Sequence, residues 1–270
     1  FIDRAPDSFK DDKYSAMRER SVGLGVMGLH SFLQKNSVPF ESVMSKVWNN
    51  KIFKHIQIEV DKASKKLSDE RGACPDAEEY GINERFSNKT AIAPTASISI
   101  ICGGASPGVE PIAANSYTHK TLSGSYNVRN RYLKKILQKY KIDDDDTWSS
   151  ITTNQGSVRH LNFLTDNEKD VFKTAFELDQ KWIIELGADR TPYVSQAQSI
   201  NIFLPADVHK RELHQIHFQA WKKGLKSLYY CRSKSIQRAE NVNNELSSKE
   251  VGKPERNEDN KEYEECLSCQ

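Results

Sequence analysis

Short apolar runs separated by long helical segments constrain the fold of this chain more than any other feature of its sequence. The runs at residues 199–204 and 227–231 have the length of buried strands. Residues 208–226 between them keep a helical pattern, as does the long segment 47–67 earlier in the chain. Strands that alternate with long helices favour parallel pairing, because each crossover needs a long connection. The pattern therefore predicts a helix-rich α/β fold.

Two local signals mark the ends of helices in this pattern. The helix over residues 47–67 is expected to end near Gly72, because glycine suits a left-handed cap and Pro75 blocks continuation. Thr165 and Glu168 have the spacing of a capping box, in which the hydroxyl and the carboxylate each bind a backbone N–H group. A further helix is therefore predicted to begin at this point.

Size and composition set the class of the protein. We expect residues 1–233 to form one folded unit and residues 234–270 a flexible tail, since Glu, Lys, Asn, Ser and Arg dominate there. A formal net charge of +2 gives no argument for nucleic-acid binding, and no apolar run is long enough to span a bilayer. No signal peptide is visible, and five scattered cysteines favour a reducing compartment, so we expect a cytoplasmic protein.

A run of small and hydroxyl residues is the first candidate site. Residues 91–102 are predicted to be a loop that leads into a short buried element and a glycine turn. Within this run, Thr95, Ala96, Ser97 and Ser99 would let backbone N–H groups approach a phosphate or diphosphate closely. No Walker motif is present, and the bare pattern fits a ligand-free Ser/Thr-rich turn better than a phosphate site.

Two adjacent tyrosines, Tyr229 and Tyr230, are the second candidate. Neighbouring residues on a strand point to opposite faces, so two phenols in contact would require a local departure from strand geometry. Two core aromatic residues are the simpler interpretation of the bare sequence. A one-electron relay through both rings is the functional alternative.

The third candidate is the pair Cys266 and Cys269 at the end of the polar tail. A tethered dithiol could enter a buried site, exchange with a disulfide there and leave to be reduced again. The alternative interpretation is that both residues are free surface cysteines without a function. A stand-alone dithiol oxidoreductase is disfavoured, because no folded domain surrounds the pair to tune a thiol pKa. The first two interpretations stay open at this point.

The remaining cysteines and the histidines suggest no further chemistry. Cys74, Cys102 and Cys231 stand among apolar or small residues, which is typical of core or near-surface thiols. His214 and His217 share one face of a helix, but no carboxylate pattern converges on them. We therefore expect a solvated helix face there and no metal site.

Taken in order, these features resemble the C-terminal portion of the large (α) subunit of class I ribonucleotide reductase, most closely the version encoded by large tailed bacteriophages. The resemblance covers nearly the whole chain. It implies that the protein is located in the cytoplasm of an infected bacterium. It is carried by residues 20–26, 71–75, 94–111 and 227–233 and by the terminal Cys-x-x-Cys. It implies the later strands and surrounding helices of a ten-stranded α/β barrel.

The resemblance also implies roles for the phosphate-loop residues. Thr95, Ala96, Ser97 and Ser99 match the loop that holds the diphosphate of a ribonucleoside diphosphate. Several relatives have a further hydroxyl residue where this chain has Ile98, so that position would offer only its backbone N–H.

The other two candidates gain roles in the same way. Tyr229 and Tyr230 match the stacked pair that carries a radical from the small (β) subunit towards an active-site cysteine. Cys266 and Cys269 match the dithiol that re-reduces the active-site disulfide and is itself reduced by thioredoxin or glutaredoxin. The resemblance implies no cofactor on this chain, and a di-iron tyrosyl radical in the small subunit.

The resemblance leaves part of the family's machinery unaccounted for. The radical-bearing cysteine, the two reducing cysteines and the Asn-x-Glu motif have no counterpart here, and the first residue is Phe1 rather than Met. The chain is therefore expected to be either a fragment of a longer polypeptide or one product of a split gene. We expect activity only beside the N-terminal half of the large subunit. The alternative is a non-catalytic interaction module that docks a partner through its helical surface.

Overall fold

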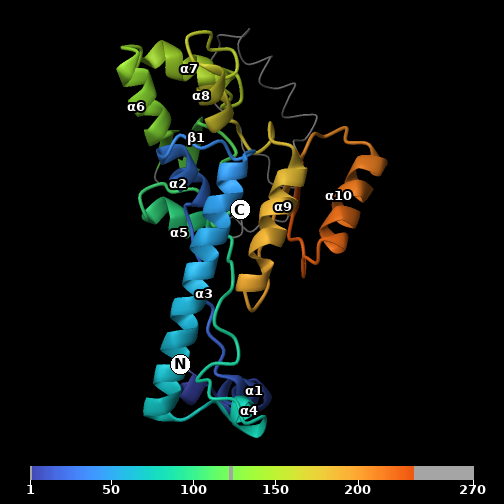
Figure 1. Ribbon diagram of the computed structural model, residues 1–270. Coiled ribbons are helices and arrows are strands. Elements are labelled where there is room, and N and C mark those ends of the chain that lie inside the picture. Colours follow the sequence, from blue (N-terminus) through green and yellow to red (C-terminus); the bar gives the residue numbers. More distant parts are fainter. Residues whose placement is uncertain (1, 122–123, 234–270) are drawn as a thin grey trace, which may run out of the picture.

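The computed structural model describes residues 2–121 and 124–233 (Figure 1), so Cys266 and Cys269 lie outside the described residues. The α-helices are α1 (Lys10–Glu19), α2 (Leu29–Lys35), α3 (Val43–Arg71), α4 (Pro75–Glu79), α5 (Ala96–Ile101), α6 (Arg131–Lys139), α7 (Asp145–Thr153), α8 (Asp166–Val171), α9 (Gln180–Arg190) and α10 (Lys210–Lys222). The strands are β1 (Ser116–Thr121), β2 (Gly124–Arg129), β3 (Ile202–Leu204) and β4 (Cys231–Ser233).

Extended segments that lie side by side in parallel form the centre of the fold. Leu24 pairs with Thr90, and Ile92 pairs with Gln198. Strand β3 then pairs with β4 in parallel, with Ile202 opposite Cys231. The segments follow one another in chain order, and helices occupy the connections between them. This arrangement confirms the predicted helix-rich α/β fold with parallel pairing.

The long helix α3 connects the body of the molecule to a small distal unit (Figure 1). It begins at the cap residue Ser42, whose hydroxyl accepts the N–H of Ser45, and it ends at Gly72, as the sequence predicts. At its far end α1 packs beside α4, and Arg18 forms ion pairs of 2.6 Å with Asp76 and 2.7 Å with Glu79.

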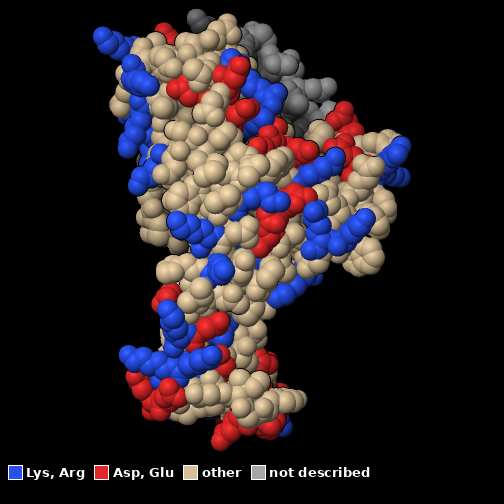
Figure 2. Space-filling model, in the orientation of Figure 1, with Lys and Arg blue, Asp and Glu red and all other residues tan. Residues whose placement is uncertain are grey.

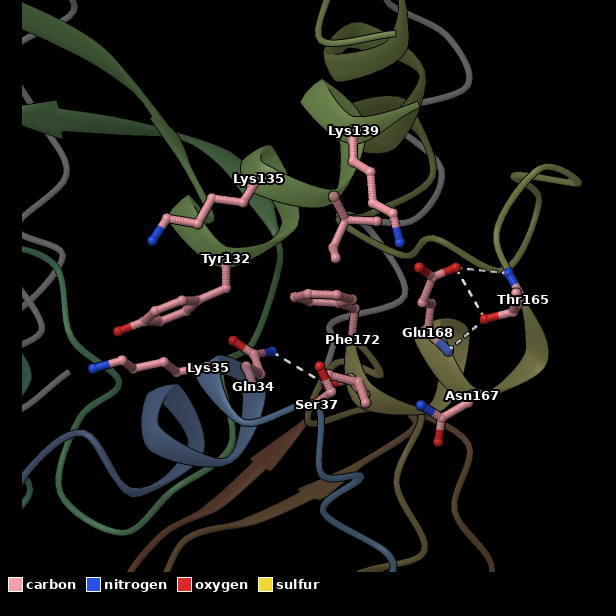
Figure 3. Close-up of a pocket in the computed structure, with 12 residues that line it drawn as sticks. Gln34, Lys35, Ser37, Tyr132, Lys135, Lys139, Thr165, Asn167, Glu168 and Phe172 are labelled. Atoms are coloured by element: carbon pink, nitrogen blue, oxygen red, sulfur yellow. Dashed lines mark hydrogen bonds between the residues drawn. The ribbon is translucent and has the colours of Figure 1, made fainter. Parts of the chain in front are cut away.

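Two helix-rich cores flank the parallel segments. One core joins α6, α7 and α8 around the fully buried Trp148. The other packs α2 and α9 against β3, with Leu33, Leu186 and Phe203 in contact at its centre. The capping box at the start of α8 is present as predicted: the N–H of Glu168 donates to the Thr165 hydroxyl, and the Glu168 carboxylate accepts the Thr165 N–H (Figure 3).

The sequence predictions for two elements are wrong. The run at residues 227–231 was predicted as a buried strand, but β4 spans Cys231–Ser233, and Tyr229, Tyr230 and Cys231 are exposed. Residues 98–102 are not a buried element: most of this run belongs to the short helix α5, and the side chains of Ile98 and Ile101 are 52% and 84% exposed. The antiparallel hairpin of β1 and β2 was not predicted, because its strands carry mostly polar residues.

The face of the molecule in Figure 2 carries both positive and negative side chains. Figure 2 shows Lys and Arg interspersed with Asp and Glu over the visible face, without a field of one sign. Among the described residues, none of the helices is both long and apolar enough to cross a membrane.

Candidate active site

A cavity of about 800 Å³ opens at the carboxyl ends of the parallel segments. Three of the four residues expected to bind phosphate, Ala96, Ser97 and Ser99, line it from α5. Phe203 and Arg232 line it from β3 and β4. Ligands bind at this end of parallel strands because the loops that follow the strands can be varied without disturbing the core. The position of the cavity therefore marks it as the candidate active site.

Thr95 has a structural part in the loop that precedes α5. It adopts a left-handed backbone conformation with φ of 53°, and its hydroxyl accepts the N–H of Gly108 at 2.7 Å. Gly108 is required there, since a Cβ atom would lie 2.8 Å from the Ala93 carbonyl oxygen. The buried Ser99 hydroxyl donates to the Ala96 carbonyl at 2.9 Å. These bonds fix the loop so that its first helical N–H groups stay free for an anion.

A network of buried amides forms one wall of the cavity. The Asn130 amide donates to Asn115 at 2.8 Å and to Gln34 at 3.0 Å. Asn115 in turn donates to the Phe172 carbonyl at 2.7 Å. Gln34 also lines a second cavity of about 320 Å³ between α2, α6 and α8, which Figure 3 shows together with Tyr132. The network therefore forms a wall shared by two cavities.

The two candidate tyrosines lie against each other. The ring centroids of Tyr229 and Tyr230 are 4.1 Å apart at an interplanar angle of 50°. The Tyr229 N–H donates to the Ile200 carbonyl at 2.8 Å, and the Tyr230 carbonyl accepts the Ile202 N–H at 2.9 Å. In a regular parallel ladder a single residue would make both bonds, so the chain contains one extra residue just before β4, opposite Asn201.

This one-residue bulge is the departure from strand geometry that the sequence argument required. It allows consecutive side chains to turn towards each other, although strand neighbours normally alternate. The bulge also leaves the Tyr230 N–H without a ladder partner, and the Asn201 side-chain oxygen accepts it at 2.9 Å. Both rings are nearly half exposed, at 43% for Tyr229 and 46% for Tyr230.

Three residues that the sequence did not predict lie together beside this bulge: Glu110, Asn201 and Arg232. Glu110 is 7% exposed and lines the large cavity, and Asn201 is fully buried. Burial raises the pKa of Glu110 to about 7, against the opposing influence of the Asn201 amide and the Arg232 guanidinium. One signal was available: Glu110 is the only acidic or basic residue between Lys89 and His119.

The described cysteines and the two histidines of α10 differ in exposure. Cys74 is buried, Cys102 and Cys231 are free and exposed, and His214 and His217 lie on the exposed face of α10. Within residues 2–121 and 124–233, no group of His, Cys, Asp and Glu side chains is arranged to hold a metal ion.

Parallel strands, crossover helices and a cavity at the carboxyl ends of the strands are the arrangement found in many α/β enzymes. The family model "Ribonucleotide reductase, barrel domain" matches residues 1–83 and 75–231. The chain belongs to this family.

Similar proteins carry the corresponding names. The ribonucleoside-diphosphate reductase large subunit of Invertebrate iridescent virus 6 is 48% identical over 246 residues, covering 90% of this chain and 25% of that protein. The putative ribonucleoside-diphosphate reductase large subunit of Frog virus 3 is 41% identical to this chain. The match covers 81% of this chain and 38% of that protein. The solved structure of the Actinobacillus ureae class Id ribonucleotide reductase alpha subunit superposes with a TM-score of 0.81 at 39% identity.

The match with the solved structure covers 87% of this chain and 43% of that one. The chain therefore spans between a quarter and less than half of the length of these relatives. This share fits the expected C-terminal portion of a large subunit.

Proposed function

We propose that this chain is the C-terminal component of a ribonucleoside-diphosphate reductase large subunit. The reaction converts a ribonucleoside diphosphate and a dithiol to the 2′-deoxyribonucleoside diphosphate, a disulfide and water. One observation carries the proposal: in a member of this family, the cavity lined by the predicted phosphate loop is also lined by Arg232 of β4, and a contacting pair of tyrosines lies directly before this strand.

In this proposal the loop binds the diphosphate of the substrate. The N–H groups at the start of α5 and the Ser97 hydroxyl would donate to phosphate oxygens, since Ala96, Ser97 and Ser99 line the cavity. Thr95 would act indirectly, because its hydroxyl already accepts the Gly108 N–H. Ile98 would contribute only its backbone.

The tyrosine pair is proposed to relay the oxidising equivalent. An oxidised Tyr230 would take one electron and one proton from Tyr229, which then takes the same from an active-site cysteine elsewhere in the large subunit. The ring centroids lie 4.1 Å apart, which favours electron transfer between the two tyrosines. Transfer through both rings replaces one long electron transfer by two short ones. The initial oxidant would be a di-iron tyrosyl radical in the partner small (β) subunit.

The reducing tail completes the proposal. Cys266 and Cys269 would reduce the active-site disulfide after each turnover and be reduced by thioredoxin or glutaredoxin. The catalytic cysteines would come from the N-terminal half of the large subunit, on the same or a separate polypeptide.

The test is reduction of CDP by the complete large subunit with its small subunit, an effector and thioredoxin. We expect Tyr230→Phe to abolish both single and multiple turnovers, because phenylalanine has no phenol O–H that can lose an electron and a proton. Cys266→Ser should allow a single turnover by pre-reduced protein and block further ones. Tyr80→Phe, which changes a tyrosine that is 81% exposed on the distal unit, is the matched control and should stay active.

Full activity in both variants would contradict the assigned roles. If the complete mixture of subunits forms no deoxynucleotide, the interaction module becomes the better explanation. In that case thioredoxin should also fail to reduce a Cys266–Cys269 disulfide.

A further inference from the structure

Asn201 carries a buried amide directly before the apolar strand β3, and the burial of this polar group needs a physical reason. It lies between Ile200 and Ile202, and its side chain is completely inaccessible to solvent. Burying an amide costs free energy unless its hydrogen-bonding groups find partners. The partner of its oxygen is the Tyr230 N–H, the one backbone donor that the bulge removes from the ladder.

The bulge competes with a regular alternative. If the extra residue moved out, the Tyr230 N–H would replace that of Tyr229 at the Ile200 carbonyl, and the ladder would become regular. Consecutive tyrosines would then point to opposite faces of the strand, and the rings would separate. Asn201 stabilises the bulged arrangement because it satisfies the donor that only this arrangement leaves free.

The orientation of the Asn201 amide matters, since only its oxygen can accept the Tyr230 N–H. Glu110 and Arg232 line the cavity, and the Asn201 amide and the Arg232 guanidinium both lie close enough to the Glu110 carboxyl to lower its pKa. Among the described residues, no hydrogen bond is made by Glu110 Oε1, Asn201 Nδ2 or Arg232 Nε. A carboxyl group facing the amide favours the NH₂ group on that side, which turns the oxygen towards Tyr230.

We propose that Asn201 is a positioning residue of the tyrosine pair: it holds the one-residue bulge that brings the two rings together, and Glu110 sets its orientation from the cavity. This inference rests on the proposed relay function of Tyr229 and Tyr230. It assigns Asn201 no contact with substrate, so its loss should change the rate of turnover and leave substrate binding intact.

The experiment measures kcat and KM for CDP reduction in the complete reductase. Asn201→Leu removes the acceptor at similar volume, and we expect kcat to fall roughly 10- to 100-fold with KM unchanged, because a small misplacement of reacting groups costs this much. The double variant Asn201→Asp with Glu110→Gln exchanges carboxylate and amide. It keeps an acceptor for the Tyr230 N–H and a donor facing it, so it should recover most of the kcat lost in Asn201→Asp alone.

Asn49→Leu is the matched control for a purely structural effect. Asn49 is equally buried, on α3, where it donates to the Leu186 carbonyl far from the tyrosines along the chain. It should lower the thermal unfolding midpoint and leave kcat per folded molecule unchanged. An equal loss of kcat in Asn49→Leu and Asn201→Leu would overturn the inference, as would a kcat of Asn201→Leu within about two-fold of the wild type.

The outcomes also separate this inference from the proposed function. Full activity in Tyr230→Phe would contradict the relay itself. An inactive Tyr230→Phe beside a fully active Asn201→Leu would contradict only the positioning role. If Asn201→Leu does not fold, the comparison of Asn201→Asp with the exchanged double variant decides, and absence of recovery overturns the inference.

Discussion

At the scale of single residues, His30 shows how burial governs ionisation. Its side chain on α2 is completely buried, its Nδ1 atom accepts the Ile112 N–H at 3.0 Å, and its ring meets Phe40 edge to face. Burial lowers the pKa of His30 from 6.5 to about 3, and the nearby Val171 carbonyl only partly offsets this. The folded protein therefore holds this imidazole neutral throughout the mildly acidic range.

The buried neutral His30 makes the stability of the folded protein depend on pH. Below about pH 6.5 the unfolded chain binds a proton at His30 that the folded chain does not bind until near pH 3. The free energy of unfolding should therefore fall with acidification, by about 1.4 kcal/mol per pH unit from this residue. His30→Asn keeps an acceptor for Ile112 and should flatten the slope, measured by urea denaturation from pH 7 to 4. His55→Asn, at an exposed position of α3, should leave the slope unchanged.

The sequence pointed to the candidate phosphate loop (Thr95 to Ser99) and to the tyrosine pair, but not to the residues that contact them. Tyr229 and Tyr230 are recognisable because they are adjacent in the chain. Asn201, Glu110 and Arg232 come from three separate segments, and only the parallel pairing of strands brings them together. A contact made by the fold leaves no local pattern, so these residues required the structure.

At the scale of elements, α3 makes a sharp test of helical continuity. Ile58 lies in the middle of this helix with its side chain 41% exposed, whereas Val43 is its first residue and is 72% exposed. Proline in a helix interior removes a hydrogen bond and clashes with the preceding turn, but it is tolerated in the first turn. We expect Ile58→Pro to lower the free energy of unfolding by about 3 kcal/mol and Val43→Pro by less than about 1 kcal/mol.

Ser42 makes Val43→Pro a fair control, because its backbone is already extended, as the residue before a proline prefers. Urea denaturation followed by circular dichroism would measure both variants. Equal losses would mean that the middle of α3 contributes no more to stability than its first turn.

The elements divide according to the strength of their periodicity. The segments 47–67 and 208–226 were predicted as helices and correspond to α3 and α10, because their apolar residues recur at the helical period. Helix α5 and the hairpin of β1 and β2 were not predicted. The hairpin gains its stability from pairing rather than from an apolar face, and pairing is not visible in a single sequence.

At the scale of the whole molecule, the parallel segments end in open edges. Leu24 donates to the Lys89 carbonyl and accepts from Ala91, so the N–H groups of Gly23 and Gly25 point away from this pairing. Both glycines are exposed, and no described segment pairs with them. A barrel has no free edges, so in the complete large subunit we expect another strand to bind here.

Amide hydrogen exchange would test this expectation. The Gly23 and Gly25 amides should exchange rapidly in this chain alone and become protected in the complete large subunit. The Leu24 and Ala91 amides should be protected in both, since their hydrogen bonds lie within the chain. Rapid exchange at both glycines in the complete subunit would contradict pairing at this edge.

The bulge at Tyr229 and Tyr230 makes the distance between the two rings a matter of counting residues. Two residues stand opposite the single residue Asn201, between the pairs that join Ile200 and Ile202 to the neighbouring strand. Removing one residue from the longer side, just before the tyrosines, would therefore even out the count. Insertion or deletion of one residue is usually tolerated on a protein surface. Here the length of the chain before β4, to a single residue, determines whether the two phenol rings are in contact.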